Sequence, residues 1–489
     1  MNGSRASEAP PASARKWPVT LTVIMGTVAV VLNATVVNVA IPPIMADFGM
    51  GQIAAQWLAT GFMAAMTATM LASARVMERF GQRRTFELAI WVFLAACVLA
   101  AMSPSSSVMI AARVLQGATA GIIQPLGLVM IFQVFDDSER GKALGMYGMG
   151  VVLAPAIGPA VGGVLIDWFS WRVIYLPAIP FGLLALWGAR RYFVDEVSPS
   201  RVAFDWLGLA LLCASLALLL IGLSELSDTP VRGCVLIATG VLAMLAFILR
   251  ALKASAPLID LSVLAYPRFA LASLLAMFYG AGLYGSTYLL PLMAQSVQQF
   301  SAGTTGLVMM PAGLALTVIF PIAGRLADRM PAHRLMLVGC GGFAIGMVGL
   351  AFSHPATAFV ALAGWIAFGR MALGVMMPAL NIDGLRSLPA QLTHQGSGMI
   401  NFTRQLGGAF GVNLFALLLQ WRVGANMGDT IDLHRLFNQA NPAPQSLSAL
   451  TTGFRETFMV MALLFVVAMV IAAWMGVLHA KFRKDSSRV

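Results

Sequence analysis

The chain of 489 residues is 59% hydrophobic and only 10% charged, with a mean hydropathy of +0.83. Because soluble proteins are about 25% charged, this composition excludes a soluble globular domain and predicts an integral membrane protein. The net charge of +11 would suit nucleic-acid binding only if the basic residues formed one patch, whereas they are spread over many short loops.

The chain begins with a polar segment and continues as a series of apolar ones. Residues 1–17 contain no cleavable signal, and we expect them to form a disordered cytoplasmic tail. A spanning helix needs about 20 apolar residues, and this rule predicts fourteen spans. They are 18–46, 53–77, 85–105, 107–134, 142–166, 171–193, 204–225, 231–253, 269–294, 304–327, 334–353, 356–381, 396–421 and 455–480.

The basic residues define the topology. An even number of spans places both termini on one side, and 23 of the 31 Lys and Arg residues then fall in the tails and loops of that side. The loops of the other side carry five. This asymmetry is the positive-inside pattern, so we predict a multi-pass protein of the cytoplasmic (inner) membrane with cytoplasmic termini and no nucleic-acid partner.

Two loops of the chain repeat one pattern. Residues 74–84 follow the second span and residues 324–334 follow the tenth, and both have an acid at the fifth place and Arg at the second, sixth and eleventh. Arg113 in span four and Arg370 in span twelve are each followed by Gly four residues later. Two homologous six-helix halves are therefore predicted, as in one class of transporters. The predicted parts are tail 1–17, N-terminal half 18–193, two inserted helices 204–253, C-terminal half 269–480 and tail 481–489.

The fifth span contains small residues at every fourth position, which places them on one face of a helix. In lipid, such a stripe lets another helix backbone approach closely, so it indicates either ordinary close packing or a dedicated role. The corresponding span thirteen has three glycines but no proline pair, and this difference favours a dedicated role, a seal against leakage. The residues concerned are Gly150, Ala154, Pro155, Gly158, Pro159 and Gly162 in span five, and Gly407, Gly408 and Gly411 in span thirteen.

These patterns together resemble the major facilitator superfamily and, within it, the fourteen-span drug:proton antiporter family of multidrug exporters. The resemblance covers nearly the whole chain: the loop motif GxLaDrxGrk is similar to both loop copies, and residues 32–42 are similar to the first-helix motif. The fourth-helix motif RxxQG is matched at Arg113, Gln116 and Gly117. The fifth-helix motif GPxxGG is matched at Gly158, Pro159, Gly162 and Gly163.

The resemblance implies roles for two groups of residues. The span-five residues would form the exporter motif, which comprises Gly150, Pro155, Gly158, Pro159, Gly162 and Gly163. The charged loops would act as a latch that holds one conformation, although a plain positive-inside loop is the simpler alternative. The latch residues are Glu78, Arg79, Gly81, Arg84, Asp328 and Arg329.

One departure from the family pattern bears on the energy source. Asn33 stands where the family's first helix normally carries an acid, and asparagine cannot bind or release a proton. None of the twenty acids or five histidines falls in the middle of a predicted span. We therefore expect an acid near a span end, Glu87 or Asp167, to substitute in proton coupling.

Polar groups inside spans are the candidates for substrate binding or coupling, because burying them in hydrocarbon is costly. Each has a structural alternative, such as bonds to backbone carbonyls or between helices. Arg404 is near enough to its span end to extend towards the interface, so it is left out. The candidates are Asn33, Arg113, Gln116, Tyr284, Tyr288 and Arg370.

The sequence thus predicts an all-helical, fourteen-span secondary transporter that exports small amphipathic or drug-like molecules, using the proton gradient. The alternative is a carrier for a specific anionic or neutral metabolite, favoured by three arginines within the spans and no acid in the middle of a span. An enzyme would need His, acid or Cys groups converging at one depth, and a sensor would show no flux. We expect no cofactor and no metal; besides the small-molecule substrate and the lipid bilayer, a periplasmic adaptor protein is a candidate partner.

Overall fold

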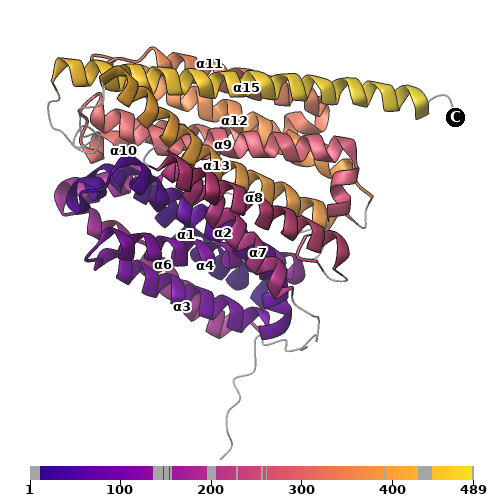
Figure 1. Ribbon diagram of the computed structural model, residues 1–489. Coiled ribbons are helices and arrows are strands. Elements are labelled where there is room, and N and C mark those ends of the chain that lie inside the picture. Colours follow the sequence, from indigo (N-terminus) through magenta and orange to yellow (C-terminus); the bar gives the residue numbers. More distant parts are fainter. Residues whose placement is uncertain are drawn as a thin grey trace, which may run out of the picture.

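The computed structural model describes residues 12–135, 147, 154, 157–194, 205–226, 229–254, 257–259, 261–389, 392–427 and 443–486. The described chain is almost entirely helical (Figure 1). A helix needs no partner to satisfy its backbone hydrogen bonds, which makes it the natural way for a chain this apolar to cross a bilayer. Two bundles lie side by side, one from the N-terminal and one from the C-terminal part of the chain.

The N-terminal bundle, called the N half below, contains six helices and a short 3₁₀ segment, η1. Helix α4 packs against α2, α3 and α1, and α6 packs against α1 and α3. The helices are α1 (Ala12–Phe48), α2 (Gln52–Phe80), α3 (Gln82–Ala101), α4 (Ser106–Val134), a helix Ile157–Trp168 without a label, and α6 (Ala178–Tyr192); η1 is Trp171–Tyr175.

The C-terminal bundle, the C half, repeats this arrangement. Helix α12 packs against α10, α11 and α9, and α15 packs against α9 and α11. The same pairs of helices are therefore in contact in both halves. The helices are α9 (Pro267–Ser296), α10 (Ala302–Arg329), α11 (Ala332–Ala351), α12 (Phe359–Arg386), α13 (Thr393–Met427) and α15 (Pro444–Ser486), and a 3₁₀ segment η2 (Leu261–Ala265) precedes them.

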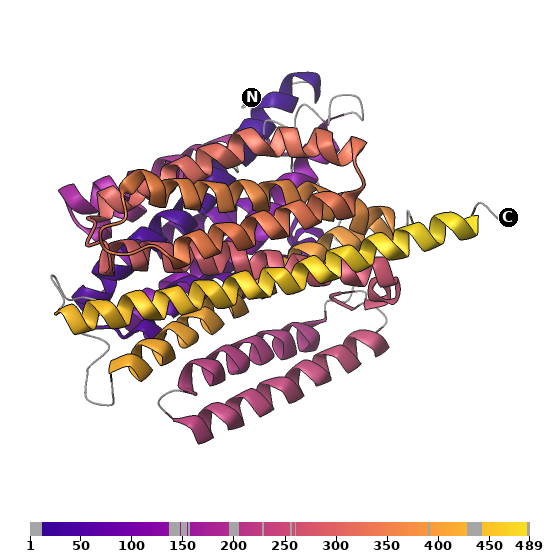
Figure 2. The same cartoon turned by 90° about the horizontal axis from the view of Figure 1, so that it is seen from above.

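The two inserted helices, α7 (Trp206–Glu225) and α8 (Pro230–Lys253), form a hairpin beside the halves (Figure 2). Helix α7 packs on α2 and α13, whereas α8 is mostly exposed. Asp205 accepts a bond from the Gly208 N–H at 2.9 Å, which caps α7, and its Oδ1 lies 2.6 Å from Nε of Arg250 in α8. The buried Asp205 carboxylate therefore caps the N-terminus of α7 and joins α7 to α8 by an ion pair.

The fourteen predicted spans all correspond to helices among the described residues. Twelve of these helices are long and apolar enough to cross a membrane by composition alone, and the other two are α2 and Ile157–Trp168. The ends differ from the prediction: α1 begins at Ala12 inside the predicted tail 1–17, and α15 continues to Ser486. The reason is that an apolar stretch marks only the part in lipid, whereas helical hydrogen bonding continues into polar residues. The predicted tail segments 1–11 and 487–489 lie outside the described residues.

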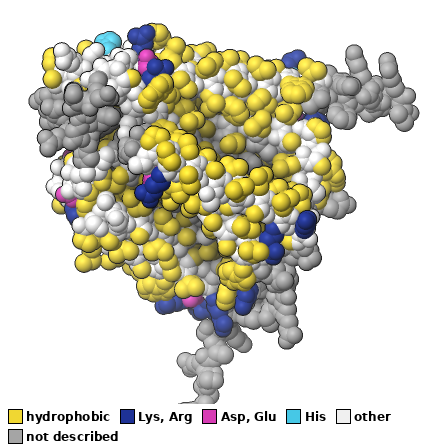
Figure 3. All heavy atoms as spheres, in the orientation of Figure 1, with side chains coloured by type: hydrophobic (Ala, Val, Ile, Leu, Met, Phe, Trp, Pro, Cys, Tyr) yellow, Lys and Arg dark blue, Asp and Glu magenta, His cyan; other side chains and the backbone are white. Residues whose placement is uncertain are grey.

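The side chains on the surface fit a location in a lipid bilayer. Hydrophobic side chains cover most of the face shown in Figure 3, and Lys and Arg side chains form small separate groups on it. Large exposed apolar side chains are common on α8 and α15, such as Leu242 and Val470. In water such a surface would aggregate, so it indicates contact with lipid.

The glycines of span five permit close helix packing, as their spacing predicts. A Cβ on Gly158 or Gly162 would lie 2.4 Å from Thr35 or Val36 of α1. The C half uses the same device, because Gly407 in α13 lies against the backbone of Met277 in α9. The stripe is therefore common to both halves. Gly150 and Pro155 lie outside the described residues.

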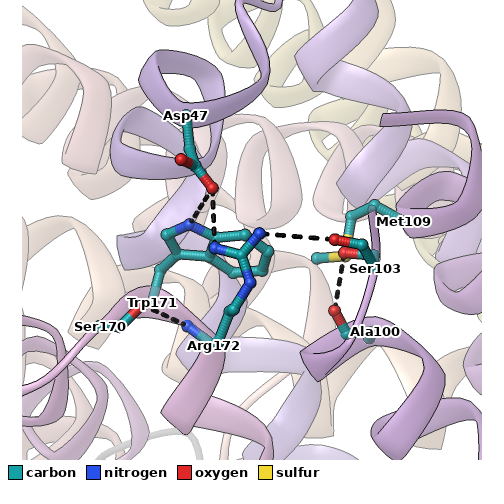
Figure 4. Close-up of polar contacts among 7 residues, drawn as sticks. All are labelled: Asp47, Ala100, Ser103, Met109, Ser170, Trp171 and Arg172. Atoms are coloured by element: carbon teal, nitrogen blue, oxygen red, sulfur yellow. Dashed lines mark hydrogen bonds and ion pairs between the residues drawn. The ribbon is translucent and has the colours of Figure 1, made fainter. Parts of the chain in front are cut away.

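A polar cluster ties together one end of the N half (Figure 4). Asp47 of α1 accepts bonds from Nε1 of Trp171 at 3.1 Å and from Nη1 of Arg172 at 2.8 Å. Nη2 of Arg172 reaches the carbonyl of Ser103, just beyond α3, at 3.4 Å. The ends of α1, α3 and η1 are thereby held together, which favours movement of the N half as a unit.

Candidate functional site

A cavity of about 310 Å³ lies between the two halves. Its walls come from α1, α2, α4 and the helix Ile157–Trp168 on one side and from α9, α10, α12 and α13 on the other. It is within the size range of small-molecule sites. Most of its surface is apolar, and its polar lining consists of Thr35, Asn38, Arg113, Gln124, Tyr279, Tyr284, Thr287, Arg370, Arg404 and Gln405.

Arg113 of α4 is held by three elements of the N half. Its Nε donates to the Leu58 carbonyl of α2 at 2.8 Å, and its Nη1 donates to Oδ1 of Asn33 at 3.0 Å and to Oε1 of Gln116 at 2.8 Å. Its guanidinium also lies 4.5 Å from the ring centre of Phe62. Asn33 thus occupies the position of a counter-ion but supplies only an amide oxygen.

Arg370 of α12 has fewer hydrogen-bond partners than Arg113 among the described residues. Its Nη1 donates to the Leu283 carbonyl of α9 at 3.0 Å, and its Nη2 donates to Oγ1 of Thr287 at 2.5 Å. The Thr287 hydroxyl itself donates to the Leu283 carbonyl at 2.6 Å. The polar groups around Arg370 therefore already have each other as partners.

Arg404 of α13 lies at the cavity, whereas its nearness to the span end predicts extension towards the interface. Its Nη1 lies 3.9 Å from Sδ of Met377, a weak acceptor, and its Nε is buried without a partner among the described residues. The neighbouring Gln405 is 1% exposed and its Oε1 likewise has no described partner. Both side chains present unused hydrogen-bonding groups at the cavity.

The structure separates the predicted site residues into three groups. Arg113, Tyr284 and Arg370 line the cavity. Asn33 and Gln116 do not line it but bind Arg113 from behind. Tyr288 is 1% exposed and is not part of the lining.

Several lining residues were not among the sequence candidates. Thr35, Gln124 and Gln405 are uncharged polar residues in apolar helices, and each is a plausible packing residue when read alone. A weak signal existed for Gln405, because it follows Arg404 directly. The face that each helix turns to the cavity became visible only in the folded bundle.

The halves are joined at the end where α1 ends and α2 begins, called the α1–α2 end. Oδ2 of Asp167 accepts bonds from Oγ of Ser301 at 2.8 Å and from the Gly303 N–H at 2.9 Å, at the start of α10. Near the same end, Gln295 of α9 donates to the Val39 carbonyl at 3.1 Å. The carboxylate sits favourably at a helix N-terminus, so Asp167 fastens the N half to α10.

Two helix pairs complete the contact between the halves. Backbone meets backbone where Gly163 lies against Ala302 and where Gly306 of α10 lies against Pro159; a Cβ on either glycine would be within 2.3 Å of a carbonyl oxygen. The second pair, α2 with α13, is joined by side chains, and Nε2 of Gln56 donates to Oδ1 of Asn413 at 2.6 Å.

The predicted latch lies at the opposite end of α2 and α10. Gly81 separates α2 from α3 with φ at 81°, a left-handed conformation that glycine adopts without strain. Arg79, Arg84 and Arg329 are exposed. The side chains of Glu78 and Asp328 lie outside the described residues, so their partners remain a prediction.

The acids expected to replace the first-helix carboxylate lie away from the cavity. Glu87 of α3 is paired with Nε of Arg83 at 2.9 Å and lies 4.0 Å from Arg190. Asp167 lies at the α1–α2 end. Of the described residues that line the cavity, none is Asp, Glu, His or Lys. No group of His, Cys, Asp and Glu suited to a metal occurs among the described residues.

The family model of the Major Facilitator Superfamily matches residues 23–412. A multidrug resistance protein B homolog of Mycobacterium tuberculosis is 30% identical over 93% of this chain and 88% of its own length. A riboflavin transporter of Clostridioides difficile is 27% identical over 82% of this chain and 88% of its own. A bacterial homolog of the human lysosomal transporter Spinster, solved in an inward-facing, unoccupied conformation, superposes with a TM-score of 0.67 at 15% identity, covering 97% of this chain and 98% of the other.

Proposed function

Because this chain belongs to the major facilitator superfamily, a family of transporters and not of enzymes, we propose that it exports small amphipathic molecules by alternating access. The observation that carries the proposal is the single cavity whose walls come from both halves. A molecule bound there contacts both bundles, so rocking one bundle against the other changes the side from which it is reached.

The contacts between the halves support a direction of opening. Asp167, Gln295 and Gln56 join the halves towards the α1–α2 end. The basic residues predict that this end faces away from the cytoplasm. We infer that this arrangement is closed at the exit and that substrate enters from the cytoplasm.

The predicted latch would hold the other conformation, in which the α1–α2 end is open. When the α1–α2 end opens, the cytoplasmic ends of α2 and α10 approach the other half, and the loops at Gly81 and Met330 come together there. The exposed Arg79, Arg84 and Arg329 are available for pairing in that state, with Glu78 and Asp328 as the proposed acceptors. The free energy of these ion pairs would offset the free energy lost when the Asp167 contacts break.

Three features support export of several compounds. The relatives include a multidrug resistance homolog, and the helix Ile157–Trp168 makes backbone contact with α10 through Gly163. Methionine side chains, such as Met63 and Met66, line the cavity, and their flexible thioethers adapt to different shapes. We propose a multidrug exporter of the inner membrane, driven by the electrochemical proton gradient.

The test uses inside-out membrane vesicles, in which an exporter moves compounds into the lumen. A panel of fluorescent amphipathic compounds is offered, and a pH gradient and a membrane potential are imposed separately with ionophores. Accumulation above that of vesicles lacking the protein, abolished when both gradients are collapsed, is expected. Equal accumulation in both vesicle types for the whole panel would contradict the proposal.

A further inference from the structure

Three arginines surround the cavity, and the described residues provide no negative charge to balance them. Arg113 and Arg370 are 1% and 7% exposed, and Arg404 is partly buried. Buried charges in proteins are normally paired because an isolated ion is costly to desolvate. None of the three has a carboxylate within ion-pair distance among the described residues.

The C half provides the clearer case, because Arg370 and Arg404 have fewer oxygen partners than Arg113 among the described residues. The bonds from Arg370 go to Leu283 and Thr287, which already bond each other. Arg404 has a buried Nε without a partner and only a sulfur contact from Nη1. Burying a cation within the membrane is costly, and these two arginines make few hydrogen bonds in return. This combination points to a bound ligand that pairs with them.

These two arginines lie on the same wall of the cavity. Arg370 comes from α12, and Nη1 of Arg404 from α13 lies 3.9 Å from Sδ of Met377, two turns further along α12. Tyr279 of α9 lines the same C-half wall and adds a hydroxyl to the guanidinium donors. Guanidinium groups bind carboxylates and sulfonates through paired, charge-assisted hydrogen bonds.

The rest of the wall suits an apolar body. Phe62, Met63 and Met66 of α2 and Leu316 and Phe320 of α10 supply apolar lining. Arg113 adds a second positive region from the N half, and because its oxygen partners are amides and a carbonyl, its charge is not cancelled. The cavity therefore combines an apolar wall with a net positive field.

Resting on the proposed export function, we propose that the substrates are amphipathic organic anions, with a carboxylate or sulfonate bound by Arg370, Arg404 and Tyr279 and an apolar body against α2 and α10. The absence of an acid at Asn33 fits this class, because a carboxylate there would neutralise Arg113 and repel the ligand. Outward movement of an anion also follows the inside-negative membrane potential. The potential can then drive export without a titratable group in the cavity.

The experiment measures binding to purified full-length protein with three probes that share one ring system. They are 2-naphthalenesulfonate, 2-naphthyltrimethylammonium and the neutral 2-naphthalenesulfonamide, compared by equilibrium dialysis. We expect the anion to bind at least about tenfold more tightly than the cation, with the neutral probe between them. Equal or tighter binding of the cation would overturn the proposal.

Substitutions locate the site. Arg370→Gln and Arg404→Gln should each weaken anion binding by about ten- to a hundredfold, the range for losing one charged hydrogen bond, with little effect on the neutral probe. Arg404→Lys should recover part of the loss. The matched control is Arg422→Gln on the same helix, α13, where Arg422 is 3.3 Å from Glu456 and outside the cavity lining.

Vesicle transport of the same probes separates this proposal from the export function. Transport of the cation but not the anion would leave the export function standing and refute the anion site. Binding of the anion, reduced in Arg370→Gln but not in Arg422→Gln, without transport of any panel compound would refute the export function and support the anion site. Size-exclusion profiles and retained neutral-probe binding identify any variant that fails to fold.

Discussion

The two halves share a helix arrangement but hold their equivalent arginines differently. Arg113 in the N half is bonded to Leu58, Asn33 and Gln116, which come from three helices. Arg370 in the C half is bonded only to α9, at groups that bond each other. The comparison indicates that repetition of a motif preserves the position of a charge while the number of its bonding partners differs, and the less bonded arginine is the one that we propose binds a ligand.

The contacts between the halves also come in two kinds. The helix Ile157–Trp168 meets α10 by backbone at Gly163 and Gly306, whereas α2 meets α13 through the amide pair of Gln56 and Asn413. The backbone contact leaves no room for added side-chain atoms, whereas the hydrogen-bonded amide pair can adjust when the helices slide. We infer that the first pair closes the α1–α2 end tightly, while the second accommodates the motion.

The largest effect is expected for Gly163→Val. A Cβ there would lie 2.3 Å from the Ala302 carbonyl oxygen, and overpacking of this kind costs about 1–3 kcal/mol, here only in the state closed at the α1–α2 end. Transport in vesicles should fall by about tenfold or more.

The matched control is Gly364→Val on α12, where a Cβ would meet nothing within 4 Å. Transport by this variant should be near that of the wild type. If the two valine variants transport equally well, the backbone contact at Gly163 is not needed to close the α1–α2 end.

Replacing the two arginines tests the comparison of the halves directly. Arg113→Met leaves the buried oxygens of Asn33 and Gln116 without their donor, and each unsatisfied group costs about 1–3 kcal/mol. Arg370→Met leaves a hydroxyl that still has a partner. Thermal unfolding in detergent should therefore show a clearly lower Tm for Arg113→Met than for Arg370→Met.

The opposite order of Tm values would reverse the assigned roles. Arg172→Met provides a reference for loss of an arginine outside the cavity, since its partner Asp47 is exposed to solvent.

Restoring an acid at Asn33 should make the N half resemble the family pattern. In Asn33→Asp a carboxylate would lie about 3.0 Å from Nη1 of Arg113 and cancel its charge. Binding of 2-naphthalenesulfonate should weaken by about tenfold, the equivalent of 1.4 kcal/mol.

The same variant should acquire a pH dependence. The new carboxylate is charged at higher pH and neutral at lower pH, so anion binding should weaken as pH rises. Wild-type binding should be flat between pH 5 and 8, because arginine stays protonated. Anion affinity equal to that of the wild type at every pH tested would show that position 33 does not act on the site.

The smallest effect is expected for Asp167→Asn. The amide oxygen can still accept from Ser301 and Gly303, but the favourable charge at the start of α10 is lost, worth about 0.3–1 kcal/mol. The state closed at the α1–α2 end should lose population, and transport should change by about two- to fivefold.

The pH-gradient dependence of transport is the second readout for this variant. If Asp167 carries the coupling proton, the asparagine variant should ignore an imposed pH gradient while still responding to membrane potential. Unchanged dependence on the pH gradient would remove Asp167 as the coupling group.

Much of the fold could be predicted because the bilayer restricts the solutions. All fourteen spans, including the weakly apolar α2, follow from the length that lipid requires, and the six-plus-six repeat follows from matched residues such as Arg113 and Arg370. The end positions were less predictable, as α1 and α15 extend beyond their apolar cores.

The candidate site was only partly predictable. Arg113, Arg370 and Tyr284 were identified because charge or a polar tip within a span is unusual, and they line the cavity. Tyr288 is also a tyrosine and lies one turn after Tyr284 on α9, but it does not line the cavity. Arg404 was assigned to the interface by its distance from the span end, yet it lies at the cavity.

The sequence by itself determined the membrane class, the helices, their repeat and the family, because hydrophobic length and motif order are local properties of the chain. Only the tertiary structure decided which face of each helix turns inward. In lipid a helix is apolar on every side, so its periodicity does not reveal its buried face. Packing alone brought Arg370, Arg404 and Tyr279 to one cavity and left Asn33 behind Arg113.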